Sequence, residues 1–197
     1  MFVRVWIRGL AWSLLLIGAL IWSEGAWLQV KAGLSQVLLE RAWQRRLADG
    51  EAHRPWPWAD HWPVARLRVP ALDEDLIVLA GDSGNVLAFA PGHAVRSGLG
   101  DDARTVVISG HRDTHFRFLE ALNPGDAITL ETRVGRYRFR VRAAEVVDSR
   151  THRIQITGTG ARLILTTCYP FDALRPGGPL RYLVVADPVR LPPPPAA

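Results

Sequence analysis

The chain has a single cysteine, Cys168, at the end of the apolar run in 163-LILTTCYPF-171. A thiol attacks a carbonyl carbon only as the thiolate, and a free cysteine with its ordinary pKa of about 8.5 is mostly protonated at neutral pH. Acyl chemistry at Cys168 would therefore need a basic neighbour, usually a histidine, and a group that stabilises an oxyanion. One cysteine excludes an internal disulfide and a multi-cysteine metal site, which leaves an inert buried thiol, an intermolecular bridge or a nucleophile.

Among the histidines, His111 has the position that best suits a partner for the thiol. It ends the apolar strand TVVISG, as Cys168 ends LILTT. Two strand ends at one rim of a small barrel would place the two side chains together as a dyad. The alternative is that His111 only caps a turn with Arg112 and Asp113. The other histidines lie in loops, in a turn or at a helix start: His53, His61, His93, His115 and His152.

An arginine is predicted to lie next to the same thiol. The strands at 161–168 and 180–187 are consecutive and should pair as an antiparallel hairpin. Arg181, near the start of the second strand, would then lie across from Cys168. Its guanidinium could hold a substrate carbonyl or the oxyanion that develops from it. The alternative is an ordinary surface arginine such as Arg175.

Short strands bounded by Gly, Pro, Asp and Asn must position these residues. A short helix is predicted over 114–122, before Asn123-Pro124-Gly125, and helical spacing also covers 32–47. Many short strands with little helix predict a mainly β domain, either a small barrel or a sandwich. The strands are expected at 66–72, 75–81, 104–111, 126–132, 136–147, 161–168 and 180–187.

The charge of the chain does not indicate a nucleic-acid partner. The net charge is +5 and Lys31 is the only lysine, but the arginines are scattered. Between 136 and 142 they alternate with Tyr, Phe and Val, which is the period of a half-buried strand with a solvated face.

Acidic residues at 73–75 and 101–102 could bind calcium, but solvated turns are commoner, so we expect no metal and no cofactor.

The first 30 residues predict a membrane anchor. Arg4 and Arg8 precede an apolar run over 9–30 that is long enough for a helix to cross a bilayer. A cleaved signal peptide is the alternative, although Ser23 and Gly25 would make a weak cleavage site. Both interpretations place the rest of the chain outside the cytoplasm. We therefore expect a single-pass protein of the cytoplasmic (inner) membrane with a periplasmic domain.

The chain divides by composition into an N-terminal anchor, a linker, a folded domain and a tail. The linker combines a helical segment with the sequence GEAHRPWPWADHWPVA, whose tryptophans could touch lipid headgroups or pack on the domain. The proline-rich tail is expected to be disordered or polyproline-like. The predicted boundaries are 1–8 for the cytoplasmic N-terminus, 9–30 for the anchor, 31–64 for the linker, 65–190 for the domain and 191–197 for the tail.

From about residue 65 to 189 the chain resembles the sortases, which are membrane-anchored cysteine transpeptidases. The resemblance rests on 110-GHRDTHF-116 and 163-LILTTCYPF-171, followed by 181-RY-182 and 184-VVA-186. The sortase pattern T-L-x-T-C is matched in its last four places, and Ile164 replaces its first threonine. The short-helix region and the Cys-Tyr-Pro-Phe sequence are similar to the class D and E sortases and to those of Gram-negative bacteria.

This resemblance implies a closed eight-stranded β-barrel with short helices and a catalytic rim. Cys168 would be the nucleophile, His111 the general acid and base, and Arg181 the residue that binds substrate and the oxyanion. The implied reaction cleaves an LPxTG-like sorting signal of a partner protein through a thioester and transfers it to an amine acceptor. Further contacts to substrate are expected from Thr166, Thr167, Arg112 and His152.

Two other functions are compatible with an extracytoplasmic β domain. An L,D-transpeptidase-like cysteine enzyme would carry a Ser-x-x-Gly-Cys motif. Here the residue directly before Cys168 is a threonine, so that motif is absent. A catalytically silent, membrane-anchored barrel that acts as a scaffold would be expected to have lost the cysteine, the histidine or the arginine. All three are present, so the sequence favours an enzyme.

Overall fold

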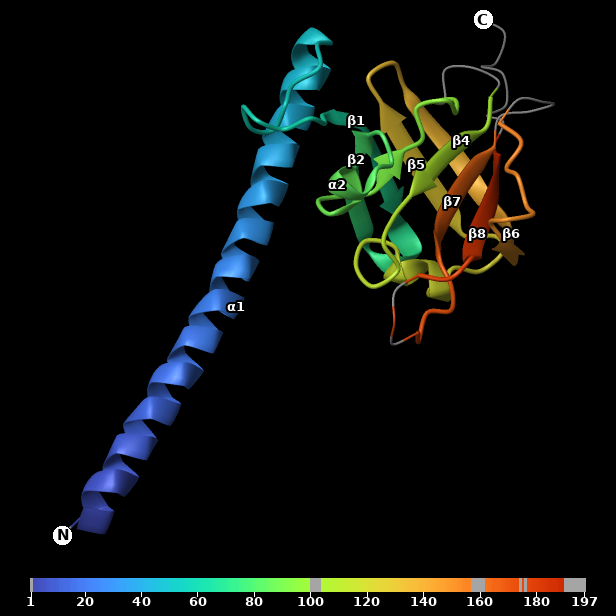
Figure 1. The fold of residues 1–197 in the computed structure, drawn as a ribbon. Coiled ribbons are helices and arrows are strands. Elements are labelled where there is room, and N and C mark those ends of the chain that lie inside the picture. The colour runs from blue at the N-terminus through green and yellow to red at the C-terminus, as the bar shows by residue number, and fades with distance from the viewer. Residues whose placement is uncertain (1, 100–103, 157–161, 174, 176, 190–197) are drawn as a thin grey trace, which may run out of the picture. The chain divides into compact units, whose positions relative to one another are not determined.

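The structure is a computed structural model that describes residues 2–99, 104–156, 162–173, 175 and 177–189. It contains one long helix, α1 (Phe2–Asp49), and a closed barrel of eight strands (Figure 1). The chain divides into two compact units, Met1–Leu38 and Leu39–Ala197. The predicted tail at 191–197 lies outside the described residues.

The first unit consists of most of α1. The helix predicted over 32–47 is the C-terminal part of this one continuous helix. The predicted membrane anchor at 9–30 also lies within α1, and most of its side chains fall outside those that the structure describes. In the part of the chain that is described, no helix is long and apolar enough to span a membrane.

The second unit is a mainly β barrel, which confirms the predicted fold class. Its strands follow the spatial order β1-β2-β3-β4-β7-β8-β6-β5 and close on themselves, so the sheet has no free edge. The strands are β1 (Pro63–Val69), β2 (Glu74–Ala80), β3 (Gly92–His93), β4 (Val106–Ser109), β5 (Ala127–Thr132), β6 (Arg136–Asp148), β7 (Leu163–Cys168) and β8 (Leu180–Pro188).

Several boundaries differ from the sequence-based prediction. β1 ends at Val69, and Pro70–Leu72 form the 3-10 helix η1, because proline has no N–H for a ladder hydrogen bond. The helix predicted over 114–122 is the shorter 3-10 helix η2 (Arg117–Ala121). Sequence reasoning missed β3 and the one-turn helix α2 (Gly84–Leu87), which are too short to show a hydrophobic period.

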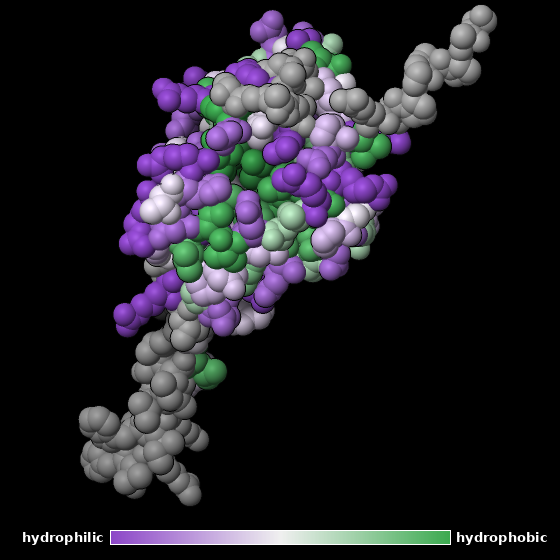
Figure 2. Space-filling view, turned by 90° about the vertical axis from the view of Figure 1, so that its right-hand side faces the viewer, coloured by the Kyte–Doolittle hydropathy of each residue, from purple (hydrophilic) through white to green (hydrophobic). Residues whose placement is uncertain are grey.

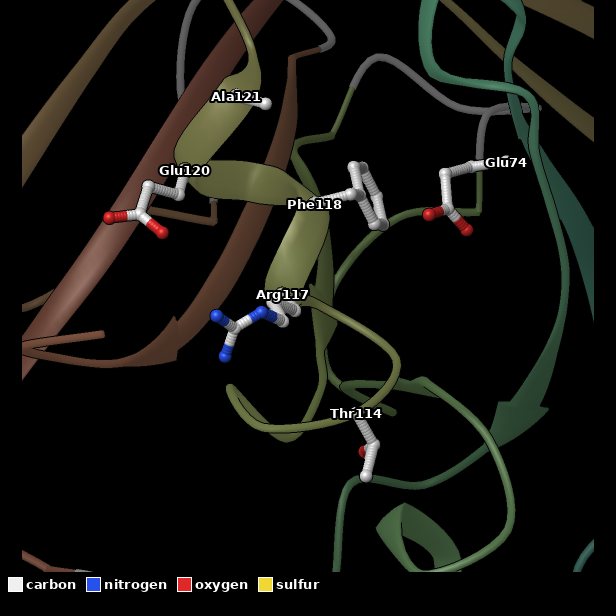
Figure 3. Close-up of a pocket in the computed structure, with 6 residues that line it drawn as sticks. All are labelled: Glu74, Thr114, Arg117, Phe118, Glu120 and Ala121. Carbon is white, nitrogen blue, oxygen red and sulfur yellow. The ribbon is translucent and has the colours of Figure 1, made fainter. Parts of the chain in front are cut away.

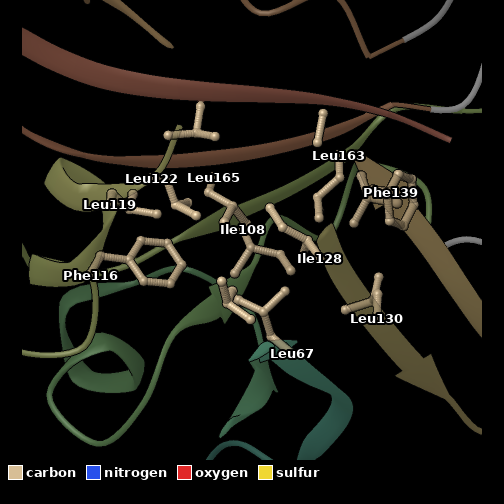
Figure 4. Packing of buried hydrophobic residues seen from close by; sticks show 14 of the residues in the cluster. Leu67, Ile108, Phe116, Leu119, Leu122, Ile128, Leu130, Phe139, Leu163 and Leu165 are labelled. Carbon is tan, nitrogen blue, oxygen red and sulfur yellow. The ribbon is translucent and has the colours of Figure 1, made fainter. Parts of the chain in front are cut away.

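The barrel core is built from alternate residues of every long strand. On β4 and β7 the inward side chains include Ile108, Leu163 and Leu165, each fully buried. Phe116 and Leu119, from the segment between β4 and β5, pack against the same cluster (Figure 4). The interior is therefore filled by side chains, and any site must lie on the outside or at a rim.

The C-terminal turns of α1 and the linker pack on the barrel within the second unit. Leu39 and Trp43 are buried in a cluster with residues of β2 and α2. In the linker, the ring of Trp56 lies edge-on to Phe89, with ring centroids 5.0 Å apart, and Trp62 packs against the barrel core. Trp58 is 83% exposed. Two of the three linker tryptophans thus contact the folded domain.

Candidate active site

The two faces of β7 have different surroundings. Side chains alternate along a strand, so every second residue points to the same face. Leu163 and Leu165 belong to the barrel core, and Thr167 is buried on that inner face. Cys168 therefore shares the outer face with Ile164 and Thr166, and its half-buried free thiol lies at the end of the strand.

His111 is brought to the same place by the parallel pairing of β4 with β7. In this ladder Ser109 lies beside Thr166. The pairing continues past β4, because the Gly110 N–H donates to the Thr166 carbonyl at 3.1 Å. Continued by two residues, this register would bring His111 level with Cys168 at the end of β7. The ends of β4 and β7 are adjacent, as predicted, and the dyad of His111 with Cys168 stays a prediction.

A close packing contact fixes the turn that carries His111. A side chain at Gly110 would place its Cβ 2.6 Å from the ring of Phe116, which is shorter than any real contact. The Phe116 N–H donates in return to the His111 carbonyl at 3.0 Å. Sequence reasoning did not single out Gly110 or Phe116. The signal available was a glycine directly before the histidine, typical of a close approach to the backbone.

Arg181 lies where the predicted hairpin places it. β7 and β8 pair as antiparallel strands, and Cys168 is the register partner of Arg181. One guanidinium nitrogen, Nη1, donates to the carbonyls of Gly178 and Leu180, both at 2.8 Å. The guanidinium is thus held against the β7–β8 connection, on the residue that pairs with Cys168. Three strands together contribute a cysteine, a histidine and an arginine to one rim.

The charges near this rim are shaped by two neighbours of His111. Burial, and then the charge of His111, lower the pKa of His115, so the neutral form of that ring is favoured. The pKa of Asp113 is lowered chiefly by its hydrogen bonds to Arg112. His115 is accordingly neutral near pH 7, and Asp113 is a carboxylate whose charge is balanced by Arg112.

Two residues predicted to contact substrate are buried and hydrogen-bonded within the protein. Thr167 is 3% exposed, and its hydroxyl donates to the Gly110 carbonyl at 2.7 Å. Arg112 is 5% exposed and is hydrogen-bonded within the protein. Alternation turns Thr167 inward and loop carbonyls accept from Arg112. Contact of either residue with substrate stays a prediction. Thr166 lies on the outer face, and its role stays a prediction.

An apolar strip extends from the rim along the outer face of the barrel. Its buried members are Val107, Ile164 and Leu183, from β4, β7 and β8. Figure 2 shows hydrophobic side chains gathered in a hollow in the middle of one face, bordered by hydrophilic ones. Four partly buried side chains pack against these three. They are Ala94, which follows β3, Val147 on β6, and Ile154 and Ile156 in the loop after β6.

A pocket of about 250 Å³ adjoins this strip, on the part of β7 furthest from the thiol. Its lining includes Ile164 and Leu183 from the strip and His152 from the loop after β6. His152 is exposed there, and its contact with substrate stays a prediction. Part of that loop, 157–161, lies outside the described residues.

A second hollow of about 640 Å³ lies at η2, close to the turn that follows His111. Figure 3 shows Phe118 and Glu74 facing each other across it, with Thr114 at one side. Burial, and then the charge of Asp73, raise the pKa of Glu74. This hollow has a different character from the strip, because its lining is mixed and it contains three charged side chains.

The acidic residues at 73–75, which the structure describes, do not form a cluster of calcium ligands. Among the described residues, no group of three His, Cys, Asp or Glu side chains is placed to hold a metal ion. The carboxylate of Asp75 instead pairs with Arg66, with oxygen–nitrogen distances of 2.6 and 2.9 Å. The second candidate pair, Asp101 and Asp102, lies outside the described residues.

Comparison with known proteins identifies the family. The sortase-domain model matches residues 67–189, which is more than half of the chain. The chain therefore belongs to the sortase family, a family of cysteine transpeptidases. Sortase D of Bacillus subtilis (strain 168) is 33% identical over 119 residues, which is 60% of this chain and 60% of that protein. The chain thus spans about 60% of the length of this curated relative.

Solved sortase structures share the fold. A sortase D5 transpeptidase of Clostridium perfringens superposes with a TM-score of 0.64 at 17% identity, covering 80% of this chain and 99% of that chain. Sortase A from Corynebacterium diphtheriae gives 0.60 at 22% identity, covering 81% and 86%. Sortase C1 from Streptococcus agalactiae gives 0.58 at 26% identity, covering 66% and 69%.

Proposed function

We propose that the chain is a cysteine transpeptidase that cleaves an LPxTG-like sorting signal and transfers it to an amine acceptor. The observation that carries this proposal is the rim itself. Three separate strands or strand ends contribute Cys168, His111 and Arg181 to one place, at the end of an apolar strip on the outer face. An extended peptide lying along that strip would bring one of its carbonyl groups to the thiol.

In the proposed mechanism the sulfur of Cys168 attacks the carbonyl carbon of the scissile peptide bond. The oxyanion that forms is stabilised by the guanidinium of Arg181. The C–N bond then breaks and His111 gives a proton to the departing amine, which leaves a thioester on Cys168. An acceptor amine attacks the thioester and loses a proton to His111, and the thiol is released as the new amide forms.

We further propose that the enzyme belongs with the class D and E sortases. Support comes from the identity to a sortase D and from the fold shared with a sortase D5. The features that suggest this class, the short-helix region at 114–122 and the Cys-Tyr-Pro-Phe sequence, also support the proposal that the chain is related to the sortases of Gram-negative bacteria.

The location that we propose is the outer side of the cytoplasmic membrane, with 1–8 inside, 9–30 as anchor and 65–190 as the catalytic domain. The support is the apolar run over 9–30 after Arg4 and Arg8. Protease added to spheroplasts tests this directly. The domain should be digested while a tag at the N-terminus stays protected, and protection of both ends would contradict the proposal.

The reaction is tested by intact-mass measurement of the second unit, residues 39–197, incubated with a pool of LPxTG-like peptides. The expected result is an acyl adduct on Cys168 that hydroxylamine removes, absent from Cys168→Ala and from His111→Ala. If no peptide of the pool forms an adduct, the rate of Cys168 alkylation decides. A rate above that of a model thiol that falls in His111→Ala keeps the enzyme and points to another motif, whereas a rate equal to the model thiol favours a silent scaffold.

A further inference from the structure

Arg112, the residue after His111, joins the two segments that carry the proposed catalytic residues. Its Nη1 donates to the carbonyl of Pro170 at 2.7 Å, and its Nη2 donates to the carbonyl of Ala173 at 3.0 Å. Pro170 and Ala173 belong to the segment that begins directly after Cys168. One guanidinium therefore fastens the connection after β7 to the turn after β4.

The same guanidinium is held from its other side by a carboxylate. Its Nε donates to Oδ1 of Asp113 at 2.7 Å, and Nη2 donates to Oδ2 at 3.0 Å. The arginine side chain is 6% exposed, whereas Asp113 is 64% exposed. A buried guanidinium is tolerated only when its donors are paired. Here a planar fork satisfies a carboxylate and two carbonyls together, which the single ammonium of a lysine cannot reproduce.

Arg112 also places a fixed positive charge beside the segment that carries the thiol. Its pKa is raised above the ordinary value, first by its hydrogen bonds to Asp113 and then by the charges of Asp113, Cys168 and Asp172. In general, a cation close to a thiol favours the thiolate over the neutral form. This is a different position from that of Arg181, which lies at the rim on the outer side.

We propose that Arg112 is a positioning residue with two effects on the reaction: it holds His111 and Cys168 in register, and it supplies a fixed positive charge that favours the thiolate. The proposal rests on the proposed function for its catalytic meaning. The geometry makes Arg112 unsuited to touch substrate, since its donors are directed at Asp113 and at the carbonyls of Pro170 and Ala173.

The test uses the full chain and two readouts on Arg112→Met, Arg112→Lys and the control Arg136→Met. Arg136 is 56% exposed on β6, and its ion pair with Glu131 is remote from the thiol in the sheet order. The first readout is the pH profile of Cys168 alkylation by iodoacetamide, which needs no peptide. The second is the rate of thioester formation with a substrate peptide. Thermal unfolding of each variant confirms that it is folded.

Removing the charge in Arg112→Met should move the midpoint of the alkylation profile to higher pH by about one unit, since an opposite charge nearby has effects of this size. Arg112→Lys keeps a cation and should restore most of that midpoint. Both variants should form the thioester about tenfold to a hundredfold more slowly, because a small misplacement of catalytic groups has effects of this order. Arg136→Met should match the wild type in both readouts.

Folded variants of Arg112 that keep the wild-type alkylation profile and acylate at the wild-type rate would overturn the proposal. If Arg112→Met does not fold, Arg112→Lys decides through its acylation rate: slow acylation supports the positioning role, and wild-type acylation overturns it. A wild-type protein that forms no thioester, but whose alkylation profile still depends on Arg112, would instead contradict the proposed function and leave the effect of Arg112 on the thiol intact.

Discussion

The inner and outer faces of β7 differ in what surrounds them, although they alternate along the same six residues. Leu163 and Leu165 lie in the barrel core and are fully buried, so a side chain at either position must be apolar and of the right volume. Ile164 and Cys168 face outward, beside the residues of two neighbouring strands. The comparison teaches that one strand can serve stability with one face and chemistry with the other. Substitutions one residue apart should therefore have different consequences.

The largest difference is expected at the end of the strand. Cys168→Ala should abolish acyl transfer completely, because no other thiol exists in the chain. It should change the free energy of unfolding by less than about 0.5 kcal/mol, as is usual for sites away from the core. Peptide turnover and urea unfolding of the same preparation measure both effects. A large loss of stability would mean that the thiol is part of the core.

Neighbouring core and strip residues should separate stability from substrate binding. Leu165→Ala should lower the free energy of unfolding by about 2–5 kcal/mol, since it leaves a cavity in a filled interior. Ile164→Ala should cost about 1–2 kcal/mol, because its side chain lines an open pocket, and should raise KM for the peptide. Urea unfolding and steady-state kinetics of the pair check this. Equal losses of stability would remove the distinction between the two faces.

The two threonines before the thiol offer a smaller contrast. Thr167→Val removes the hydroxyl that donates to the Gly110 carbonyl and should destabilise the fold by about 1–3 kcal/mol. It should also slow thioester formation, because Gly110 precedes His111. Thr166→Val on the outer face should leave the free energy of unfolding within about 0.5 kcal/mol of the wild type. Stability losses in the reverse order would show that the assignment of faces is wrong.

The smallest effect concerns pH and lies at the end of β6. The hydrogen bonds of Asp148 to Arg150, first the side-chain and then the backbone bonds, lower the pKa of Asp148 from 3.8 to about 2. A depressed pKa gives stability that is present above the unfolded value, near 3.8, and is lost as the pH falls through about 2.

Wild type and Asp148→Asn should therefore differ most above about pH 5, and the difference should disappear between about pH 4 and 2. Thermal unfolding midpoints measured across this range at low salt provide the check. A difference that grows on acidification would contradict the assigned shift. The effect should be small because Arg150 is 73% exposed.

Much of the fold was predictable because long strands show their period in the sequence. The runs that became β5 and the first part of β6 alternate, β7 and β8 contain short apolar runs, and the hairpin of β7 with β8 follows from their adjacency. β3 was not predictable, since two residues carry no period. The parallel pairing of β4 with β7 joins residues 57 positions apart, such as Val106 and Leu163, and local sequence contains no signal for it.

The site was predictable at Cys168, His111 and Arg181 as far as position is concerned, because each lies at a strand end next to an apolar run. The surroundings of Arg112 and Thr167 were not predictable, for the same physical reason. Their polar side chains suggested contact with substrate, but both are buried and hydrogen-bonded to backbone carbonyls. Sequence shows that a residue is polar, and only the fold shows which partner satisfies it.

The most direct test of the central claim is a crystal structure of the domain with a thiol-bearing LPxT-like peptide linked by a disulfide to Cys168. We predict that the peptide lies on the outer face, passes Thr166 and Ile164, and reaches toward the pocket lined by His152, with its terminal carbonyl near Arg181. A peptide that instead runs over Thr114 and Phe118 into the hollow at η2 would contradict the account. The apolar strip would then have no part in binding the sorting signal.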